Sequence, residues 1–380
     1  MPASAAPLAL RTEDFEYDLP AELVASRPAE RRDASRLLVL DRASGELSDR
    51  YFADFPAFPR PGDALVLNDT RVFPARLLGQ KPTGAAAEVF LLRPHDPSAE
   101  SALAGPGPGG SGSGQRVWEA LVRPGGKLKP GREVVVAPGF RILIGDSLEG
   151  GLRLVTLEGD GDPWDLIEEH GTVPLPPYME RPSDELDRER YQTVYADERG
   201  SVAAPTAGLH LTHDALASLE ASGVHVVRIT LHVGLGTFRP LDAERLDQHR
   251  MHSEWYRMED AAAQTLNRVR GAGGHIWAVG TTSARVLETV AAAVAASGDE
   301  SQAATGDAFR AAAGLTDLFI YPPYEWRGVD HLLTNFHLPR SSLLMLVCAL
   351  AGRDQVLAAY QHAVEQRYRF YSYGDAMLVL

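Results

Sequence analysis

Polar side chains that can bind a ligand or move a proton are concentrated in two glycine-containing runs. The first, GSVAAPTAGLH, spans residues 200–210, and the second, LHVGLGTF, spans residues 231–238. Glycines in these runs allow positive φ angles or a close backbone approach to a ligand; they include Gly208, Gly234 and Gly236. The hydroxyl and imidazole groups come from Ser201, Thr206, His210, His232 and Thr237. We therefore predict that both runs face a substrate.

A metal site is the first alternative for the histidines. His210 and His213 are three residues apart, and His249, His252 and Glu254 form an H-x-x-H-x-E pattern. Zinc and iron sites use these residue types. Neither spacing matches a strong signature such as H-E-x-x-H. We predict no metal site, and a metal-dependent hydrolase remains the rival function.

Two short segments are candidates for binding an anion. GLGTF lacks the third glycine of a dinucleotide fingerprint, and GTTSAR at residues 280–285 lacks the P-loop lysine. Each could still cradle an anion at a helix N-terminus, with Arg285 in the first turns. Alternatively, Thr281, Thr282 and Ser283 only cap the helix that follows, and Arg285 forms a surface ion pair. Both interpretations stay open.

Acid–base chemistry fits the polar residues better than covalent catalysis. The chain has no G-x-S-x-G motif, and its one cysteine, Cys348, lies in the apolar run LLMLVCAL. Any single histidine or carboxylate could equally be a hydrogen-bonded structural residue. The candidates are marked by their concentration in turn-rich loops: His210, His232, His252, Glu254, Asp317 and His337.

Three further polar stretches are LNDTRVFPARL at 67–77, TNFHLPRSSL at 334–343 and YRFYSYGDAM at 368–377. The first could be only a turn, and Ser341 in the second could be only a helix cap. The third alternates arginines with aromatic residues, which suits base stacking and phosphate contact in RNA recognition. It could instead be a C-terminal strand with Phe370 in the core.

The elements that must position these residues fall into two patterns. Residues 62–157 contain short apolar runs separated by Gly and Pro, which predict a small β-barrel or sandwich. Within it, the Gly/Ser/Pro-rich segment 94–115 is expected to be a flexible hairpin loop. After residue 163, helical and strand patterns alternate, which predicts a layered α/β domain with a largely parallel sheet. We expect residues 1–61 and 160–380 to form this domain and residues 62–159 to be inserted into it.

Bulk properties narrow the function classes. The chain has 37 Lys and Arg against 51 Asp and Glu, a formal net charge of −14. This acidity argues against a non-catalytic RNA-binding module, although a local basic groove is compatible with it. A single cysteine, no signal-peptide pattern and no apolar run of membrane-spanning length predict a cytoplasmic protein. No coiled-coil heptads are present, and we predict a monomer.

Segments running in order from Phe15 to Leu378 together resemble one family, the S-adenosylmethionine:tRNA ribosyltransferase-isomerases of queuosine biosynthesis. They include PGDALVLNDTRVFPARL, YQTVYADERGSVAAPTAGLHLT, TLHVGLGTFRP, HRMHSEWY, AVGTTSARVLE, TNFHLPRSSLLMLV and YRFYSYGDAML. Departures are mild, such as Pro323 where the family has glycine in YPGY. The resemblance implies an α/β domain with an inserted β-barrel. It also implies that the ribosyl part of S-adenosylmethionine is transferred and isomerised onto 7-aminomethyl-7-deazaguanine at the tRNA wobble position. The products would be epoxyqueuosine-tRNA, adenine and methionine, with no cofactor because S-adenosylmethionine is consumed.

This resemblance suggests roles for particular residues. We assign acid–base roles to His210, His232 or His252, with Glu254 as second choice. Arg71, Arg285 and Arg369 are the expected contacts for anionic groups, including tRNA phosphates. The remaining expected substrate contacts are Thr206, Gly208, Gly234, Gly236, Thr237, Thr281, Thr282, Asn335 and His337.

Overall fold

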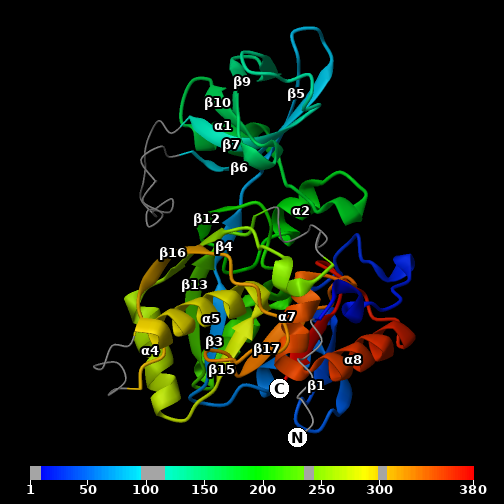
Figure 1. The fold of residues 1–380 in the computed structure, drawn as a ribbon, viewed down its shortest axis with the longest axis vertical. Coiled ribbons are helices and arrows are strands. Elements are labelled where there is room, and N and C mark those ends of the chain that lie inside the picture. The colour runs from blue at the N-terminus through cyan, green and yellow to red at the C-terminus, as the bar shows by residue number, and fades with distance from the viewer. Residues whose placement is uncertain (1–9, 96–115, 235–243, 298–305) are drawn as a thin grey trace, which may run out of the picture.

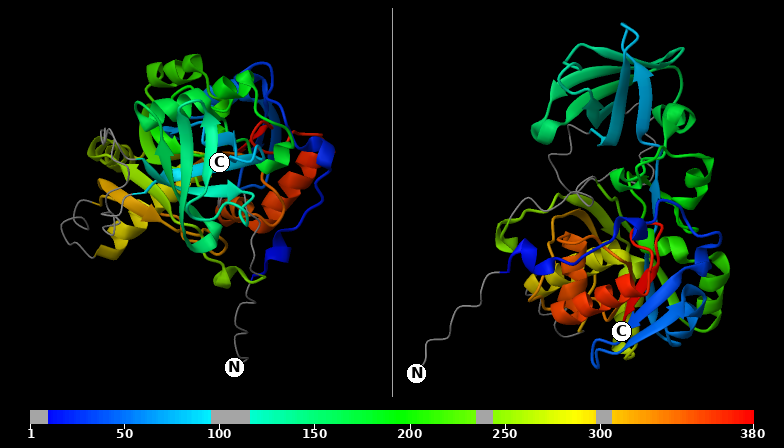
Figure 2. Two further views of the ribbon diagram at one scale, coloured as in Figure 1. Left: turned by 90° about the horizontal axis from the view of Figure 1, so that it is seen from above. Right: turned by 90° about the vertical axis from the view of Figure 1, so that its right-hand side faces the viewer.

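The computed structural model describes residues 10–95, 116–234, 244–297 and 306–380. A β-barrel stands at one end of the molecule, and a larger α/β domain lies beneath it (Figures 1 and 2). A two-stranded parallel ribbon and the short helix α2 (Glu185–Arg190) lie between them (Figure 1). The strands of this ribbon are β4 (Thr70–Val72) and β12 (Glu198–Ser201).

The α/β domain is built on one large sheet. Within the described residues its nine strands follow the order β16-β14-β13-β3-β15-β17-β18-β1-β2. Neighbouring strands are parallel from β13 to β17 and mixed toward the edges. The strands are β1 (Arg36–Leu40), β2 (Leu47–Tyr51), β3 (Ala64–Asn68), β13 (His225–Leu231), β14 (Glu254–Met258), β15 (Ile276–Val279), β16 (Ala312–Thr316), β17 (His331–Asn335) and β18 (Ala376–Val379).

Alternation along the strands gives this sheet two buried faces. In β1, Leu38 and Leu40 belong to one core cluster, whereas Leu37 and Val39 belong to another. The first face is covered by α4 (Asp260–Gly271), α5 (Gly280–Ser297), α7 (Ser342–Ala351) and α8 (Arg353–Glu365). The second is covered by α3 (His213–Ala221) and the 3-10 helices η4 (Phe52–Ala57) and η7 (Thr206–His210). The predicted α/β fold class is confirmed, with parallel pairing concentrated at the sheet centre.

The barrel closes on itself because β5 pairs with both β6 and β8. Within the described residues its strands are β5 (Arg76–Gln80), β6 (Ala86–Pro94), β7 (Val117–Arg123), β8 (Glu133–Ala137), β9 (Phe140–Ser147) and β10 (Arg153–Glu158). The short β11 (Gly171–Thr172) adds to β5, and α1 (Pro163–His170) packs Ile167 into the barrel core. Antiparallel β6 and β7 confirm the expected hairpin, whose loop residues 96–115 lie outside the described residues.

The structure differs from the sequence expectations at four places. Helix α1 and β11 pack on the barrel, so the barrel unit extends to residue 172 and does not end at residue 159. β3 (64–68) was expected in the barrel but pairs between β13 and β15, so the barrel starts at β5 and not at residue 62. The apolar run TDLFIY at 316–321 has a strand-like composition, but the strand of this region is β16, which pairs with β14 from Ala312 to Thr316. Thr281 and Thr282 are not in a loop, because α5 already begins at Gly280.

Among the described residues, no single helix is both long and apolar enough to cross a membrane. Helices α7 and α8, bent by 116° at their break, meet the length and composition criteria only when taken together.

Candidate active site

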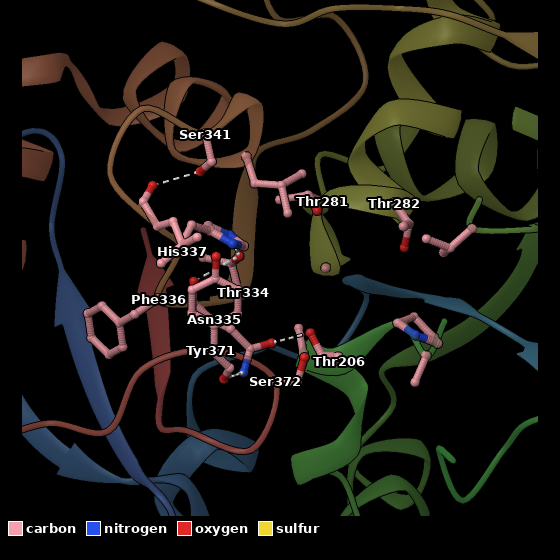
Figure 3. Close-up of a pocket in the computed structure, with 17 residues that line it drawn as sticks. Thr206, Thr281, Thr282, Thr334, Asn335, Phe336, His337, Ser341, Tyr371 and Ser372 are labelled. Atoms are coloured by element: carbon pink, nitrogen blue, oxygen red, sulfur yellow. Dashed lines mark hydrogen bonds between the residues drawn. The ribbon is translucent and has the colours of Figure 1, made fainter. Parts of the chain in front are cut away.

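The carboxyl ends of the central strands border a small pocket, here named the strand-end pocket. In open α/β sheets this edge is where ligands bind. Its cavity volume is about 60 Å³, and hydroxyl groups dominate its polar wall. Figure 3 shows Thr281 and Thr282 at the start of α5 facing residues that follow β17, with Thr206 below. The polar side chains of the lining are Thr206, Thr281, Thr282, Thr334, Asn335, His337, Ser341, Tyr371 and Ser372.

Asn68 holds this edge of the sheet together. Its Nδ2 atom donates to the Leu231 carbonyl at 3.0 Å and to the Thr282 hydroxyl at 3.2 Å. Its Oδ1 atom accepts from the Leu231 amide at 3.0 Å. The side chain is fully buried, so one amide joins the ends of β3 and β13 to the first turn of α5. The run at 67–77 is therefore not only a turn, since it contains the end of β3, all of β4 and the start of β5, and Asn68 in it has a structural role.

His210 lies behind the strand-end pocket and does not line it. Its Nδ1 atom is 3.0 Å from the Ser35 hydroxyl, and its Nε2 atom accepts from Asn335 Nδ2 at 3.2 Å. Asn335 Oδ1 in turn accepts from the Thr206 hydroxyl at 2.9 Å. Burial lowers the pKa of His210 to about 4, so the ring is neutral. Both ring nitrogens are thus engaged by the protein, and the ring fixes Asn335 and Thr206.

His337 also faces this pocket as a neutral imidazole. Its Nε2 atom is 2.8 Å from the Thr334 hydroxyl, and burial lowers its pKa to about 3. Its backbone is held on both sides, because the Tyr360 hydroxyl accepts from its amide at 3.1 Å and the Tyr17 hydroxyl donates to its carbonyl. The predicted residues Thr206, Thr281, Thr282, Asn335 and His337 are therefore brought together around one pocket.

A much larger hollow lies between the barrel and the large sheet, and we name it the interdomain cleft. Its volume of about 630 Å³ is in the usual range for ligand sites, roughly 300–1,000 Å³. Val233 lines both this cleft and the strand-end pocket, so the two adjoin. The barrel contributes Leu92, Arg93, Pro94, Glu119 and Leu152 to the lining, and α1 contributes Trp164. The ribbon strand β12 and the α/β domain contribute Arg199, Gly200, His232, Gly234, His252, Glu254, Trp255 and Leu315.

His232 is the histidine that borders the cleft from the end of β13. Its Nδ1 atom is 2.8 Å from the Thr70 hydroxyl, and its ring stacks on Trp255 with centroids 5.0 Å apart. A Cβ atom on Gly200 would come within 2.5 Å of Nε2, so only glycine leaves room for the ring. Burial and the nearby Arg257 charge lower the pKa of His232 to about 4. The described residues provide a hydrogen-bond partner for Nδ1 and none for Nε2.

Glu254 is held by an ion pair beneath the cleft. One carboxylate oxygen accepts from the Arg285 guanidinium, and the other accepts from the Gly234 amide at 2.8 Å. The side chains of both partners are at least 95% buried. Arg285 also donates to the carbonyls of Leu318 and Thr316. The pair connects β14, α5 and the segment after β13, so Arg285 is not in the surface ion pair considered from the sequence.

Comparison with known proteins now identifies the family. Residues 12–379 match the family described as queuosine biosynthesis protein. The chain belongs to this family. It is 50% identical over 374 residues to the S-adenosylmethionine:tRNA ribosyltransferase-isomerase of Symbiobacterium thermophilum, covering 98% of this chain and 100% of the relative. It is 49% identical over 373 residues to the enzyme of the same name from Syntrophomonas wolfei, covering 97% of both chains.

A solved structure supports the same family. The crystal structure of S-adenosylmethionine tRNA ribosyltransferase from Thermotoga maritima is 36% identical in sequence. It matches with a TM-score of 0.52 over 97% of this chain and 100% of that chain. The family resemblance stated from the sequence is therefore confirmed, together with the two-part fold that it implied.

The other predicted site residues of this family member lie in several places. His252 is exposed at the cleft, and Arg71 is exposed in a separate recess lined by other arginines. Gly208 lies in neither pocket; a Cβ atom there would be 1.9 Å from the Tyr195 hydroxyl oxygen. Arg369 donates to the Arg27 carbonyl. Gly236 and Thr237 lie outside the described residues. Among the described residues, no group of three or more His, Cys, Asp and Glu side chains has metal-binding geometry.

Sequence reasoning missed most of the aromatic wall of the cleft. Trp164 lies in the first turn of α1, and the Arg199 guanidinium lies 5.2 Å from its ring centroid. Trp255 supports His232 from the neighbouring strand β14. A tryptophan next to a predicted site carboxylate, as in His252-Ser253-Glu254-Trp255, is the one local signal that could have indicated this role.

Proposed function

We propose that this chain carries out the reaction of its family on a modified tRNA. The ribosyl part of S-adenosylmethionine is transferred and isomerised onto 7-aminomethyl-7-deazaguanine at the wobble position. Epoxyqueuosine-tRNA, adenine and methionine are the products. The identity of about 50% over nearly the whole chain to two enzymes of that name supports this proposal, and so does a cleft that adjoins a polar pocket at the strand ends.

The chemistry requires a base, an acid and shelter from water. The sulfonium charge acidifies the 5′ carbon of the ribosyl group, and a base removes a proton there. Adenine then leaves with a proton, the aminomethyl nitrogen of the tRNA base attacks, and the epoxide closes as methionine departs. General acids and bases contribute roughly 10²- to 10⁴-fold each when correctly placed. The site must therefore present a neutral base beside the ribosyl group.

His232 meets these requirements best. The observation that carries the mechanism is that its Nδ1 atom is bonded to the Thr70 hydroxyl while its Nε2 atom borders the cleft. The Thr70 hydroxyl lies 3.5 Å from the Glu198 carbonyl and can donate to it. The His232 Nδ1–H then donates to the Thr70 oxygen, which leaves the Nε2 lone pair free for the ligand. Because the pKa of His232 is lowered to about 4, the ring remains neutral at physiological pH. We assign the proton-accepting role to Nε2 of His232 and the proton donation to adenine to His252.

The two hollows divide the substrates between them. The strand-end pocket offers hydroxyl groups and the N-terminus of the 18-residue helix α5, whose dipole favours a carboxylate. We place the methionine part of S-adenosylmethionine there and the ribosyl group beside Val233, where the hollows adjoin. The cleft offers Trp164 and Arg199, whose flat groups stack on an extruded base. The wobble base therefore enters the cleft.

One assay tests the reaction and the assignment together. Purified protein is incubated with S-adenosylmethionine and tRNA carrying the aminomethyl-deazaguanine base, and adenine and methionine are quantified by chromatography. Release of both, dependent on the modified tRNA, supports the proposal, and no release from the unaltered protein refutes it. The cytoplasmic location and the monomeric state remain predictions.

A further inference from the structure

A third hollow, separate from both pockets above, has a strongly basic wall. We name it the arginine recess. It lies beside α2, β4 and α1, with a volume of about 490 Å³. Its charged side chains are Arg32, Arg71, Arg188, Glu168 and Glu189. Three arginines around one hollow stand out in a chain whose net charge is −14, and such local reversals mark binding sites for anions.

Arg71 is the arginine of this recess that is free to bind a ligand. It is exposed on β4, and among the residues that the structure describes its guanidinium has no hydrogen-bond or ion-pair partner. The other two are anchored by main-chain carbonyls. Arg32 donates to the carbonyls of Leu209 and Glu189 at 3.1 and 2.9 Å, and Arg188 donates to that of Glu168 at 3.2 Å.

The charges around the recess are not neutralised by its own carboxylates. Glu168 lies 3.9 Å from Arg199, a residue of the interdomain cleft, and not against Arg71. Glu189 is exposed at the rim of the recess, and its carboxylate competes with an anion there. The pKa of Arg32 is lowered by burial and by the neighbouring Arg190 charge. This crowding of positive charge is relieved when an anion binds.

The recess adjoins the place where the tRNA base enters. Arg71 on β4 is the register partner of Arg199 on β12, and register partners in a sheet carry their side chains on the same face. Arg199 lines the interdomain cleft, whereas Arg71 lines the recess. The two arginines therefore stand side by side at the border between the hollows. A nucleic-acid strand leaving the cleft over this ribbon meets Arg199 first and Arg71 next.

We propose that the arginine recess binds a backbone phosphate of the tRNA, from a nucleotide adjacent to the one held in the cleft. The inference rests on the proposed function, because it assumes that the wobble base occupies the cleft. Arg71 makes the charged contact, and Arg32 and Arg188 add positive potential. Arginine suits this role because its planar fork of N–H donors matches phosphate oxygens.

Replacing Arg71 with alanine tests the proposal. The matched control is Arg60→Ala. Arg60 is also exposed, but it lies before the N-terminal end of β3, whereas Arg71 lies beyond the C-terminal end of that strand. For Arg71→Ala we expect the KM for tRNA to rise about tenfold, as for loss of one charge-assisted hydrogen-bonded contact. The slope of log affinity against log salt should fall by roughly 0.7 to 0.9. The KM for S-adenosylmethionine and the behaviour of Arg60→Ala should match the unaltered enzyme.

A second variant should act in the opposite direction. Glu189→Gln removes the exposed carboxylate and keeps the main-chain carbonyl that holds Arg32. We expect the KM for tRNA to fall about two- to threefold at low salt, with the difference vanishing at high salt as charges are screened.

The outcomes separate this inference from the proposed function. An active unaltered enzyme whose KM for tRNA and salt slope are unchanged in Arg71→Ala overturns the phosphate site alone. A rise in the KM for S-adenosylmethionine in that variant also overturns it, because Arg71 would then belong to the other substrate. An unaltered protein that releases no adenine from any substrate overturns the proposed function instead. In that case direct binding of the tRNA, measured with the same variants, still tests the recess.

Discussion

The buried histidines beside the strand-end pocket and the interdomain cleft differ in how many of their ring nitrogens are bonded to the protein. His210 behind the first and His232 beside the second both have a pKa lowered to about 4 by burial. His210, however, uses both ring nitrogens on protein partners, whereas His232 uses only Nδ1 among the described residues. Burial and pKa therefore do not distinguish a positioning histidine from a reactive one. The free lone pair does, and the sequence hypothesis that ranked His210 with His232 lacked this information.

The largest effect should come from His232. We expect His232→Ala to reduce kcat for adenine release by about 10²- to 10⁴-fold, because the base is removed. Circular dichroism and melting temperature should show that the fold is retained. His225, exposed on the same strand, supplies the matched control His225→Ala with unchanged kcat. If the His232→Ala enzyme keeps a kcat within threefold of normal, His232 is not the base, and the contrast with His210 fails.

Glu254 should behave as a structural group although it borders the cleft. Glu254→Ala leaves the buried Arg285 charge without its partner, which costs about 3–5 kcal/mol of folding stability. Chemical denaturation measures this loss. The control is Glu259→Ala, whose carboxylate is 67% exposed in its pair with Arg257 and should change stability by less than about 1 kcal/mol. A stable Glu254→Ala protein without activity would instead make Glu254 a reactive group of the cleft.

His210 should affect stability more than chemistry. His210→Ala removes two buried hydrogen bonds and leaves a cavity, at a cost of about 2–3 kcal/mol in the free energy of unfolding. We expect a higher KM for S-adenosylmethionine, because Asn335 and Thr206 lose their support, and a kcat lowered by less than about tenfold. If kcat instead falls as far as in His232→Ala while stability is unchanged, His210 is the base.

The smallest effect should be that of mild acid on the reaction. A histidine with its ordinary pKa would lose about nine-tenths of its neutral form between pH 7.5 and 5.5. His232, with its pKa lowered to about 4, keeps the neutral, proton-accepting form down to nearly that pH. We therefore expect kcat not to fall between pH 7 and 5.5, because the proposed base stays neutral over this range. The folded fraction is measured in parallel, because lowered histidine pKa values remove stability progressively as pH falls below about 6.5 toward 4.

The sequence predicted those elements whose pattern is local. Strands β6 to β10 of the barrel alternate and are separated by turn residues, so they were found. β3 reads ALVLN, and such a short run has no period that distinguishes a doubly buried central strand from a barrel strand. β16 was missed because its pairing with β14 decides its position, while the more apolar residues Phe319 and Tyr321 pack on each other after the strand ends.

The sequence predicted which residues line the site, but not which contacts they make with one another. Thr206, Thr281, Asn335 and His337 do line one pocket, because loops after parallel strands converge at one edge. Their roles depend on contacts across the chain, such as the bond between His210 and Asn335 over 125 positions. No pattern within one segment reveals such a contact. For the same reason the sequence does not show that Arg71 and Arg199 are partners in the ribbon of β4 and β12.

The position of β18 has a consequence for how this protein is made. β18 (376–379) is the last strand along the sequence, yet it lies inside the large sheet, between β17 and β1. β1 and β3 are therefore synthesised more than 300 residues before the large sheet can be completed. The barrel closes from neighbouring segments and can fold while the ribosome is still working, as local contacts form fastest. We expect nascent chains to contain a folded barrel and an incomplete large sheet. The unpaired strands of that sheet would need protection by chaperones until β18 has left the ribosome.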